Sequence, residues 1–311
     1  IAHIALPDKF TYPFHYTPHP LCVMAADEVQ VYLQHQAQWQ DELQQGKMFG
    51  VLIVQTTEGE IGYLAAFSGI LAGKNIHPYF VPPIYDLLQP DGFFKKEEEH
   101  ISAINHRIRE LEEDTSYQKC RQALEEETAR CSQLLSQAKA KLKAAKELRD
   151  CRRQTEQLSE SEQAAMIRES QFQKAELKRL ERNLKEHLSS LQKETDTYVS
   201  QIEALKNERK SRSATLQQQL FEQFRLLNAR GEVKDLCSIF AHTVHKIPPA
   251  GAGECAAPKL LQYAYFHHYR PVAMAEFWWG DSPKAEIRHH GHYYPACKGK
   301  CEPILGQIGR A

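Results

Sequence analysis

The sequence predicts an α+β protein: a small mixed globular body interrupted by a long antiparallel coiled-coil helical hairpin. The central stretch lacks helix breakers, since no glycine lies between Gly92 and Gly231 and no proline between Pro90 and Pro248. Leu, Glu, Lys, Arg, Gln and Ala, which are strong helix formers, fill this stretch instead. The flanking segments are rich in glycine, proline and short β-prone runs, as expected for a globular body.

Within the central stretch, apolar residues recur at alternating steps of three and four, which is the spacing of a coiled-coil seam. The first seam comprises Ile101, Ile104, Ile108, Leu111, Leu124, Cys131, Leu134, Ala138, Leu142 and Ala145. The second comprises Leu177, Leu180, Leu184, Leu188, Leu191, Tyr198, Ile202, Leu205 and Leu216. Charged residues beside such a seam are usually a solvated face, and a specific nucleic-acid surface is the alternative.

A turn near residues 157–163 predicts that the chain folds back on itself. Ser159 and Glu162 have the spacing of a capping box that opens a second helix. Each arm would have ~65 residues and extend ~100 Å at 1.5 Å per residue. The domain prediction is therefore residues 1–92 and 231–311 as the two halves of the body, and 93–230 as the hairpin. A dimer formed through an intermolecular coiled coil has the same seam pattern and stays open.

Before the hairpin, residues 1–26 are rich in proline, histidine and aromatics, which predicts an extended segment lying on the body. A helix is expected from Asp27 to about Gln45, followed by strands at Met48–Thr56 and Ile61–Phe67. The glycines and lysine in residues 69–74 predict a surface turn, because their spacing is not that of a phosphate-binding loop.

After the hairpin, Val233–Thr243 is expected to be a short helix. A second helix should run from Glu254 through Phe266, and Arg270-Pro271 should end it. A buried strand is predicted at Val272–Trp279 and a short strand at Glu286–His290.

Bulk properties narrow the class of protein without naming it. The net charge of -1 gives no global attraction to nucleic acid. No apolar run is long enough to cross a membrane and no signal peptide is visible, so the 8 cysteines are expected to be reduced in the cytoplasm. A first residue other than methionine suggests a fragment of a longer protein.

Three cysteines have the pattern of a metal site. Cys297 and Cys301 follow a proline and are separated by a short glycine-containing loop, while Cys255 precedes a predicted helix. The arrangement loosely resembles the zinc site of nucleotide and nucleic-acid deaminases but departs from it in two ways. Ala256 and Ala257 stand where a deaminase has its glutamate, and three residues rather than two separate Cys297 from Cys301. The resemblance therefore implies bound zinc without the chemistry, and plain buried thiols are the alternative.

The same end of the chain holds a basic-aromatic cluster whose composition suits stacking on unpaired bases and contacting phosphate. A packed aromatic core with surface lysines is an equally good interpretation. The predicted RNA-binding residues are Trp278, Trp279, Arg288, His289, His290, Lys298 and Lys300.

Several blocks resemble the long N-terminal region that precedes the catalytic domain in some large bacterial RluA-type RNA pseudouridine synthases. The blocks are residues 49–52, 62–69, 80–83, 255–264, 274–280, 286–291 and 294–301. The resemblance spans nearly the whole chain, although the coiled coil matches only in character. It implies isomerisation of uridine to pseudouridine in ribosomal or transfer RNA, a reaction that needs no cofactor.

The family's catalytic aspartate lies in an Arg-Leu-Asp motif, and no such motif occurs in this sequence. The chain alone is therefore expected to be an accessory, RNA-positioning region rather than a catalyst. The alternative is a stand-alone coiled-coil interaction protein with a zinc-stabilised, degenerate deaminase-like body.

Overall fold

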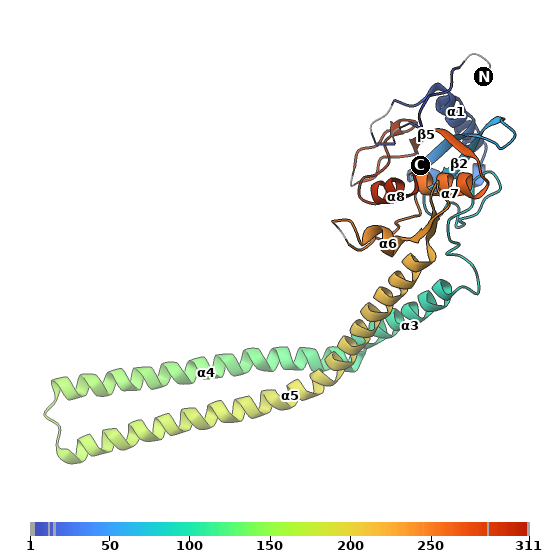
Figure 1. The fold of residues 1–311 in the computed structure, drawn as a ribbon. Coiled ribbons are helices and arrows are strands. Elements are labelled where there is room, and N and C mark those ends of the chain that lie inside the picture. Colours follow the sequence, from blue (N-terminus) through green and yellow to red (C-terminus); the bar gives the residue numbers. More distant parts are fainter. Residues whose placement is uncertain (1–3, 12, 15–16, 245, 285, 310–311) are drawn as a thin grey trace. The chain divides into compact units, whose positions relative to one another are not determined.

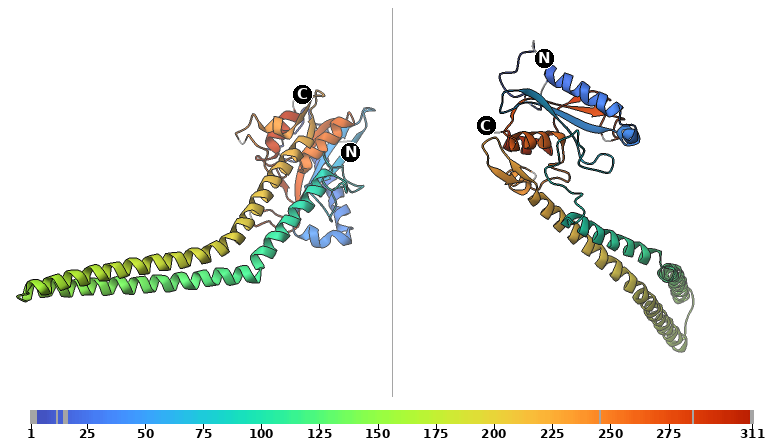
Figure 2. Two further views of the ribbon diagram at one scale, coloured as in Figure 1. Left: turned by 90° about the horizontal axis from the view of Figure 1, so that it is seen from below. Right: turned by 90° about the vertical axis from the view of Figure 1, so that its right-hand side faces the viewer.

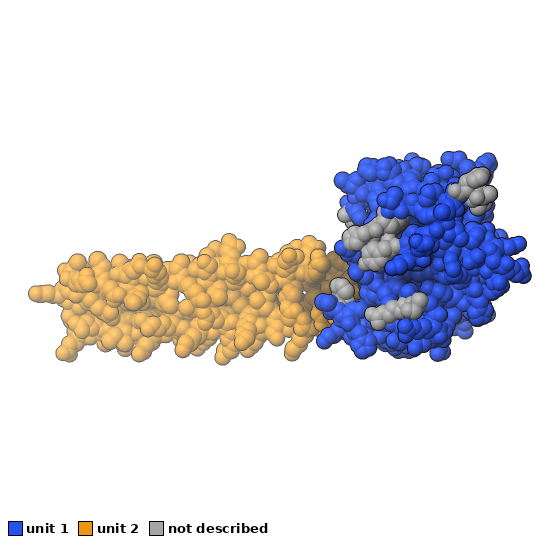
Figure 3. Space-filling model, turned by 45° about the horizontal axis from the view of Figure 1, so that its top comes forward, with its two compact units in different colours: residues 1–99, 213–311 blue, residues 100–212 orange. Residues whose placement is uncertain are grey.

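The computed structural model describes residues 4–11, 13–14, 17–244, 246–284 and 286–309 (Figure 1). It confirms the predicted α+β class. The chain divides into two compact units, residues 1–99 with 213–311 and residues 100–212 (Figure 3).

A four-stranded antiparallel sheet with the order β2-β1-β5-β6 organises the first unit. Its strands are β1 (Lys47–Gln55), β2 (Ile61–Phe67), β5 (Arg270–Trp279) and β6 (Tyr293–Tyr294). The central strand β1 pairs with β2 on one side and with β5 on the other. Because β1 and β5 come from opposite ends of the chain, the segments on both sides of the hairpin build one sheet.

Helices cover both faces of this sheet. Side chains such as Phe49 and Val51 pack in a core with helix α1 (Pro20–Gln34), whereas Leu52 and Val54 pack with helix α7 (Ala256–Phe266). Successive side chains of a strand point to opposite faces. Because both faces are covered, β1 is buried over most of its length. Figure 2 shows the sheet between these helical layers.

Glycine at position 50 allows α7 to lie close to the sheet. A Cβ atom there would come within 3.0 Å of the Ala256 Cβ and 3.1 Å of the Leu260 Cδ1. Real Cβ contacts are rarely that short in a close-packed interior. Gly50 also pairs in register with Glu276 of β5, which faces the same helix.

The helix predicted at Asp27–Gln45 is wrong in its bounds. Helix α1 begins at Pro20, where the fixed φ of proline suits the first helical turn and His19 caps the Leu21 N–H. It ends at Gln34. A 3₁₀ turn (Ala37–Trp39) and helix α2 (Gln40–Gln44) follow, and the buried Trp39 ring has its centroid 4.6 Å from that of His77.

Two predictions in the C-terminal segment are also wrong. Val233–Asp235 is strand β4, paired with β3 (Arg225–Leu227), and only then does Asp235 cap the short helix α6 (Leu236–Phe240). Residues 286–290 form a loop rather than a strand. The Ser282 hydroxyl accepts the Arg288 N–H at 2.9 Å and replaces a strand partner. Helix α8 (Cys301–Ile308) ends the segment.

Three helices supply the second unit: α3 (Phe93–Glu113), α4 (Thr115–Thr155) and α5 (Glu160–Gln223). The start of α3, residues 93–99, and the end of α5, residues 213–223, belong to the first unit. The predicted turn is confirmed, since the Ser159 N–H donates to Glu162 Oε2 at 2.8 Å and Ser159 Oγ accepts the Glu162 N–H. The first arm is not continuous, because Asp114 caps a new helix through the N–H groups of Ser116 and Tyr117.

Contacts within the chain show that α5 runs antiparallel to α3 and α4, and the helices α4 and α5 lie side by side in Figures 1 and 2. Residue numbers rise on one arm as they fall on the other in the pairs Glu112–Lys206, Tyr117–Tyr198, Lys139–Glu181 and Arg149–Gln173. One predicted seam residue is wrong: Leu134 is exposed, and Leu135 takes its place in the four-three step from Cys131 to Ala138.

Among the described residues, no helix combines the length and apolar character needed to cross a membrane.

Candidate metal centre

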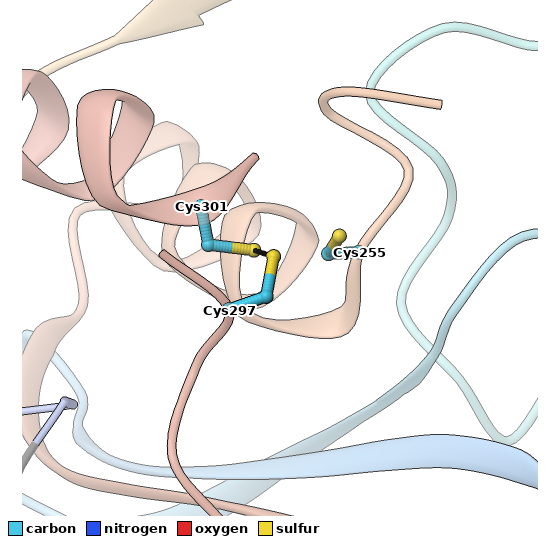
Figure 4. Close-up of side chains that lie close together, drawn as sticks. All are labelled: Cys255, Cys297 and Cys301. Carbon is cyan, nitrogen blue, oxygen red and sulfur yellow. Dashed lines mark hydrogen bonds between the residues drawn. The ribbon is translucent and has the colours of Figure 1, made fainter. Parts of the chain in front are cut away.

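Three cysteine thiols converge at the N-terminal ends of two helices. Cys255 is the N-cap of α7, Cys301 is the first residue of α8, and Cys297 lies in the loop just before α8. The three Sγ atoms all lie within 4.8 Å of one another, and those of Cys297 and Cys301 are 3.5 Å apart. Figure 4 shows the Cys297 and Cys301 side chains pointing toward each other, with Cys255 beside them. The structure therefore brings together all three cysteines that the sequence singled out.

The local backbone fixes this convergence. The carbonyl of Cys297 accepts the N–H groups of Cys301 at 3.1 Å and Glu302 at 3.2 Å, which folds the loop back onto the start of α8. The apolar face of α8, including Ile304 and Ile308, packs in the same core as α7. Cys301 is buried, Cys255 is partly buried, and Cys297 is the most exposed of the three.

The three thiols form one electrostatic unit. Hydrogen bonds from Cys255 and Cys301 lower the pKa of Cys297 to about 2, with help from two backbone N–H groups. The hydrogen bond with Cys297, together with burial, raises the pKa of Cys255 to about 12. Hydrogen bonds with Cys255 and then Cys297, together with burial, raise the pKa of Cys301. Without a metal ion, the cluster therefore favours a thiolate at Cys297 beside protonated thiols at Cys255 and Cys301.

A divalent cation could replace the two remaining protons. Three sulfurs around a tetrahedral zinc lie roughly 3.8 Å apart at a Zn–S distance of about 2.3 Å. The spacing of the thiols is close to that arrangement, and thiolates are the ligands that suit zinc. The cluster can hold a metal ion through three protein ligands, and a fourth position remains for another donor.

Glu276 is the functional candidate that sequence reasoning missed. It lies on β5 beneath the first turn of α7 and is fully buried, with its Oε1 accepting the Ala257 N–H at 3.2 Å. Burial raises the pKa of this carboxyl to about 7, and the neighbouring Cys297 adds to the rise. A glutamate inside the apolar strand run Met274–Trp279 was the available signal. Positions 256 and 257 still lack the deaminase glutamate, but a carboxyl reaches the site from the strand.

The residues predicted to bind RNA fall into two groups. Trp279 is buried against His290 with ring centroids 4.0 Å apart. Arg288 lies between the rings of Trp278 and Tyr294, at 5.4 and 4.9 Å from their centroids, and forms an ion pair with Glu286.

His289, His290 and Lys298 are exposed and Lys300 is partly exposed. Lys298 and Lys300 lie in the loop between Cys297 and Cys301. The RNA-binding role of all seven residues stays a prediction.

Comparison with known proteins gave no match, since no protein-family model, curated protein or solved structure proved similar to the chain. The resemblance to RluA-type synthases therefore also stays a prediction.

Proposed function

We propose that the chain is a zinc-stabilised, RNA-positioning accessory region of an RluA-type pseudouridine synthase, without catalytic activity of its own. The observation that carries the proposal is the placement of two lysines between two candidate metal ligands, Cys297 and Cys301. A metal bound by Cys297 and Cys301 would hold the loop that carries Lys298 and Lys300 in one conformation. Preorganised cations on a metal-held loop suit phosphate contacts with little loss of conformational entropy on binding.

Zinc is the metal that the donor set favours. Three thiolates and a fourth position are common to structural and catalytic zinc sites, and thiolates discriminate against magnesium and calcium. When bound, zinc would link the start of α7 to the start of α8 and so fasten the C-terminal segment to the sheet. Glu276 would neighbour this centre as a buried carboxyl that supports the first turn of α7 through the Ala257 N–H.

Metal analysis tests the first half of the proposal. Protein purified without chelator should contain one zinc per chain, and Cys301→Ser should lose it and unfold at a lower temperature. Cys237→Ser is a matched control, because Cys237 is partly exposed and lies outside the cluster. Wild-type protein without stoichiometric zinc would contradict the proposal.

RNA binding tests the second half. The chain should bind a fluorescein-labelled ribosomal RNA stem-loop with an affinity that falls steeply as salt increases, because phosphate contacts release counterions. It should convert no uridine in that RNA.

The double variant Lys298→Ala/Lys300→Ala should bind about 3- to 10-fold more weakly. The exposed pair Lys74→Ala/Lys234→Ala serves as its control. Arg288→Ala is a poorer probe, because its guanidinium supports two aromatic rings.

The alternative function is a coiled-coil interaction protein whose zinc-stabilised body has no RNA role. Glu276 beside the cysteine cluster favours its deaminase-like ancestry. Stoichiometric zinc together with no RNA binding at low salt would select this alternative.

A further inference from the structure

A basic hollow lies on the second unit, between helices α4 and α5 and close to the turn that joins them. It measures about 490 Å³, and its charged lining is six basic side chains and one acidic side chain, Asp150. The basic residues are Lys139, Lys143, Lys146, Arg149, Arg153 and Lys174. No sequence motif had drawn attention to this place.

Arg149 gives the hollow an uncompensated positive charge. It occupies a seam position on α4, four residues after Ala145, and only 6% of its surface is exposed. Its Nη1 donates to the neutral Gln173 amide oxygen at 2.8 Å, and no ion pair with a carboxylate involves it in the described part of the chain. A buried charge without a counter-ion is unfavourable, so an anion entering the hollow would gain a strong partner.

The neighbouring lysines are available for such an anion. Lys146 and Lys174 are exposed and have no ion-pair partner among the residues described. Lys143 approaches Glu147 only at 4.0 Å, with 79% of its side chain exposed. Exposed pairs of this kind contribute little to stability, so a phosphate could replace the glutamate.

The concentration of charge is local. Residues 139–153 carry seven Lys and Arg against two acids, whereas the rest of the hairpin, residues 100–138 and 154–212, carries 16 against 18. Lys139, Lys143, Lys146, Arg149 and Arg153 recur at steps of three or four along α4. These steps place them on one face, with about one cation per 5.4 Å turn. A solvated coiled-coil face typically alternates charges of opposite sign along the helix, and this face does not.

We propose that this basic hollow binds the phosphate backbone of RNA and is a second RNA contact of the chain, separate from the metal-held loop. The assignment of RNA rests on the proposed function. A row of cations along one helix face fits a continuous polyanion, and the buried guanidinium can form two hydrogen bonds with one phosphate. An acidic protein is the competing partner, and the experiment below separates the two.

The test measures binding of the full chain to the same labelled RNA stem-loop over a range of salt concentrations. Lys143→Ala/Lys146→Ala/Lys174→Ala removes three exposed charges of the hollow and leaves the seam intact. We expect roughly tenfold weaker binding and a salt slope lower by about two to three, as for the loss of three phosphate contacts. The matched control, Lys178→Ala/Lys185→Ala/Lys193→Ala, removes three exposed lysines of α5 outside the hollow and should bind as wild type.

The outcomes separate this inference from the proposed function. If wild-type protein binds no RNA, the proposed function and this inference both fail. If wild-type protein binds RNA but the two triple variants bind equally well, only the hollow is overturned. Unlabelled RNA should displace the probe far better than polyglutamate at equal charge concentration. Equal displacement would overturn the assignment to RNA and favour an acidic protein.

Discussion

Replacing the buried Lys259 with methionine should abolish a rise in stability that the wild-type protein shows above about pH 8. Lys259 lies on α7 and donates to the carbonyls of Phe67 at 2.9 Å and Gly69 at 3.3 Å. Its ammonium also lies 4.8 Å from the centroid of the Phe67 ring. These contacts join helix α7, whose N-cap is Cys255, to the end of β2, so they help to position a predicted metal ligand.

The magnitude follows from the pKa of the lysine. Burial lowers it from 10.5 to about 8, against a smaller opposing effect of Glu254. Between these two pH values the unfolded chain holds a proton that the folded chain has lost, so the free energy of unfolding increases with pH. The full increase is about 3 kcal/mol, at up to about 1.4 kcal/mol per pH unit. Below about pH 8 both states are protonated and this contribution has no slope.

Urea unfolding of wild type and Lys259→Met from about pH 7 to about pH 10 measures the effect. The stability of wild type relative to the variant should increase by about 2–3 kcal/mol over this range. Cysteines and tyrosines titrate in both proteins, so their contributions largely cancel in the difference. The absolute difference at one pH is less informative, because methionine removes a buried charge but also leaves two carbonyls without a donor.

Lys234→Met, at an exposed position of β4, is the control and should follow wild type at every pH. A difference between wild type and Lys259→Met that stays constant with pH would refute the assignment of a buried, destabilised ammonium.

Three further predictions concern the hairpin. Arg149→Leu should raise the free energy of unfolding by about 1 kcal/mol or more, because an apolar seam residue replaces a buried charge, and it should weaken RNA binding; a less stable variant in urea unfolding would contradict this. Carbodiimide should crosslink Lys206 to Glu112 within a single chain, because their charged groups are 2.7 Å apart. If mass spectrometry finds this link only between chains, the intrachain hairpin is excluded. Ser159→Ala should lower thermal stability by about 1 kcal/mol through loss of the helix cap, and an unchanged melting temperature would show that the cap contributes nothing.

The sequence alone determined the features that depend on local spacing. The capping box at Ser159 and Glu162, the helix that starts beside Cys255 and the central strands all formed where the residues predicted them. Helix propensity, capping and strand alternation act over a few residues, so a single sequence contains them. Spacing alone could not decide whether Leu134 or Leu135 follows Cys131 in the seam, because steps of three and of four residues both fit a coiled coil.

The tertiary structure decided which distant residues meet. It placed Cys255 beside Cys297 and Cys301, put Glu276 beneath them, and directed Arg149 and Lys174 of separate helices into one hollow. It also packed Trp279 into the core. The composition of the basic-aromatic cluster that contains Trp279 was equally consistent with a surface for stacking bases. Burial and pairing of this kind depend on how the helices and strands pack against one another, and residue spacing along the chain does not specify that packing.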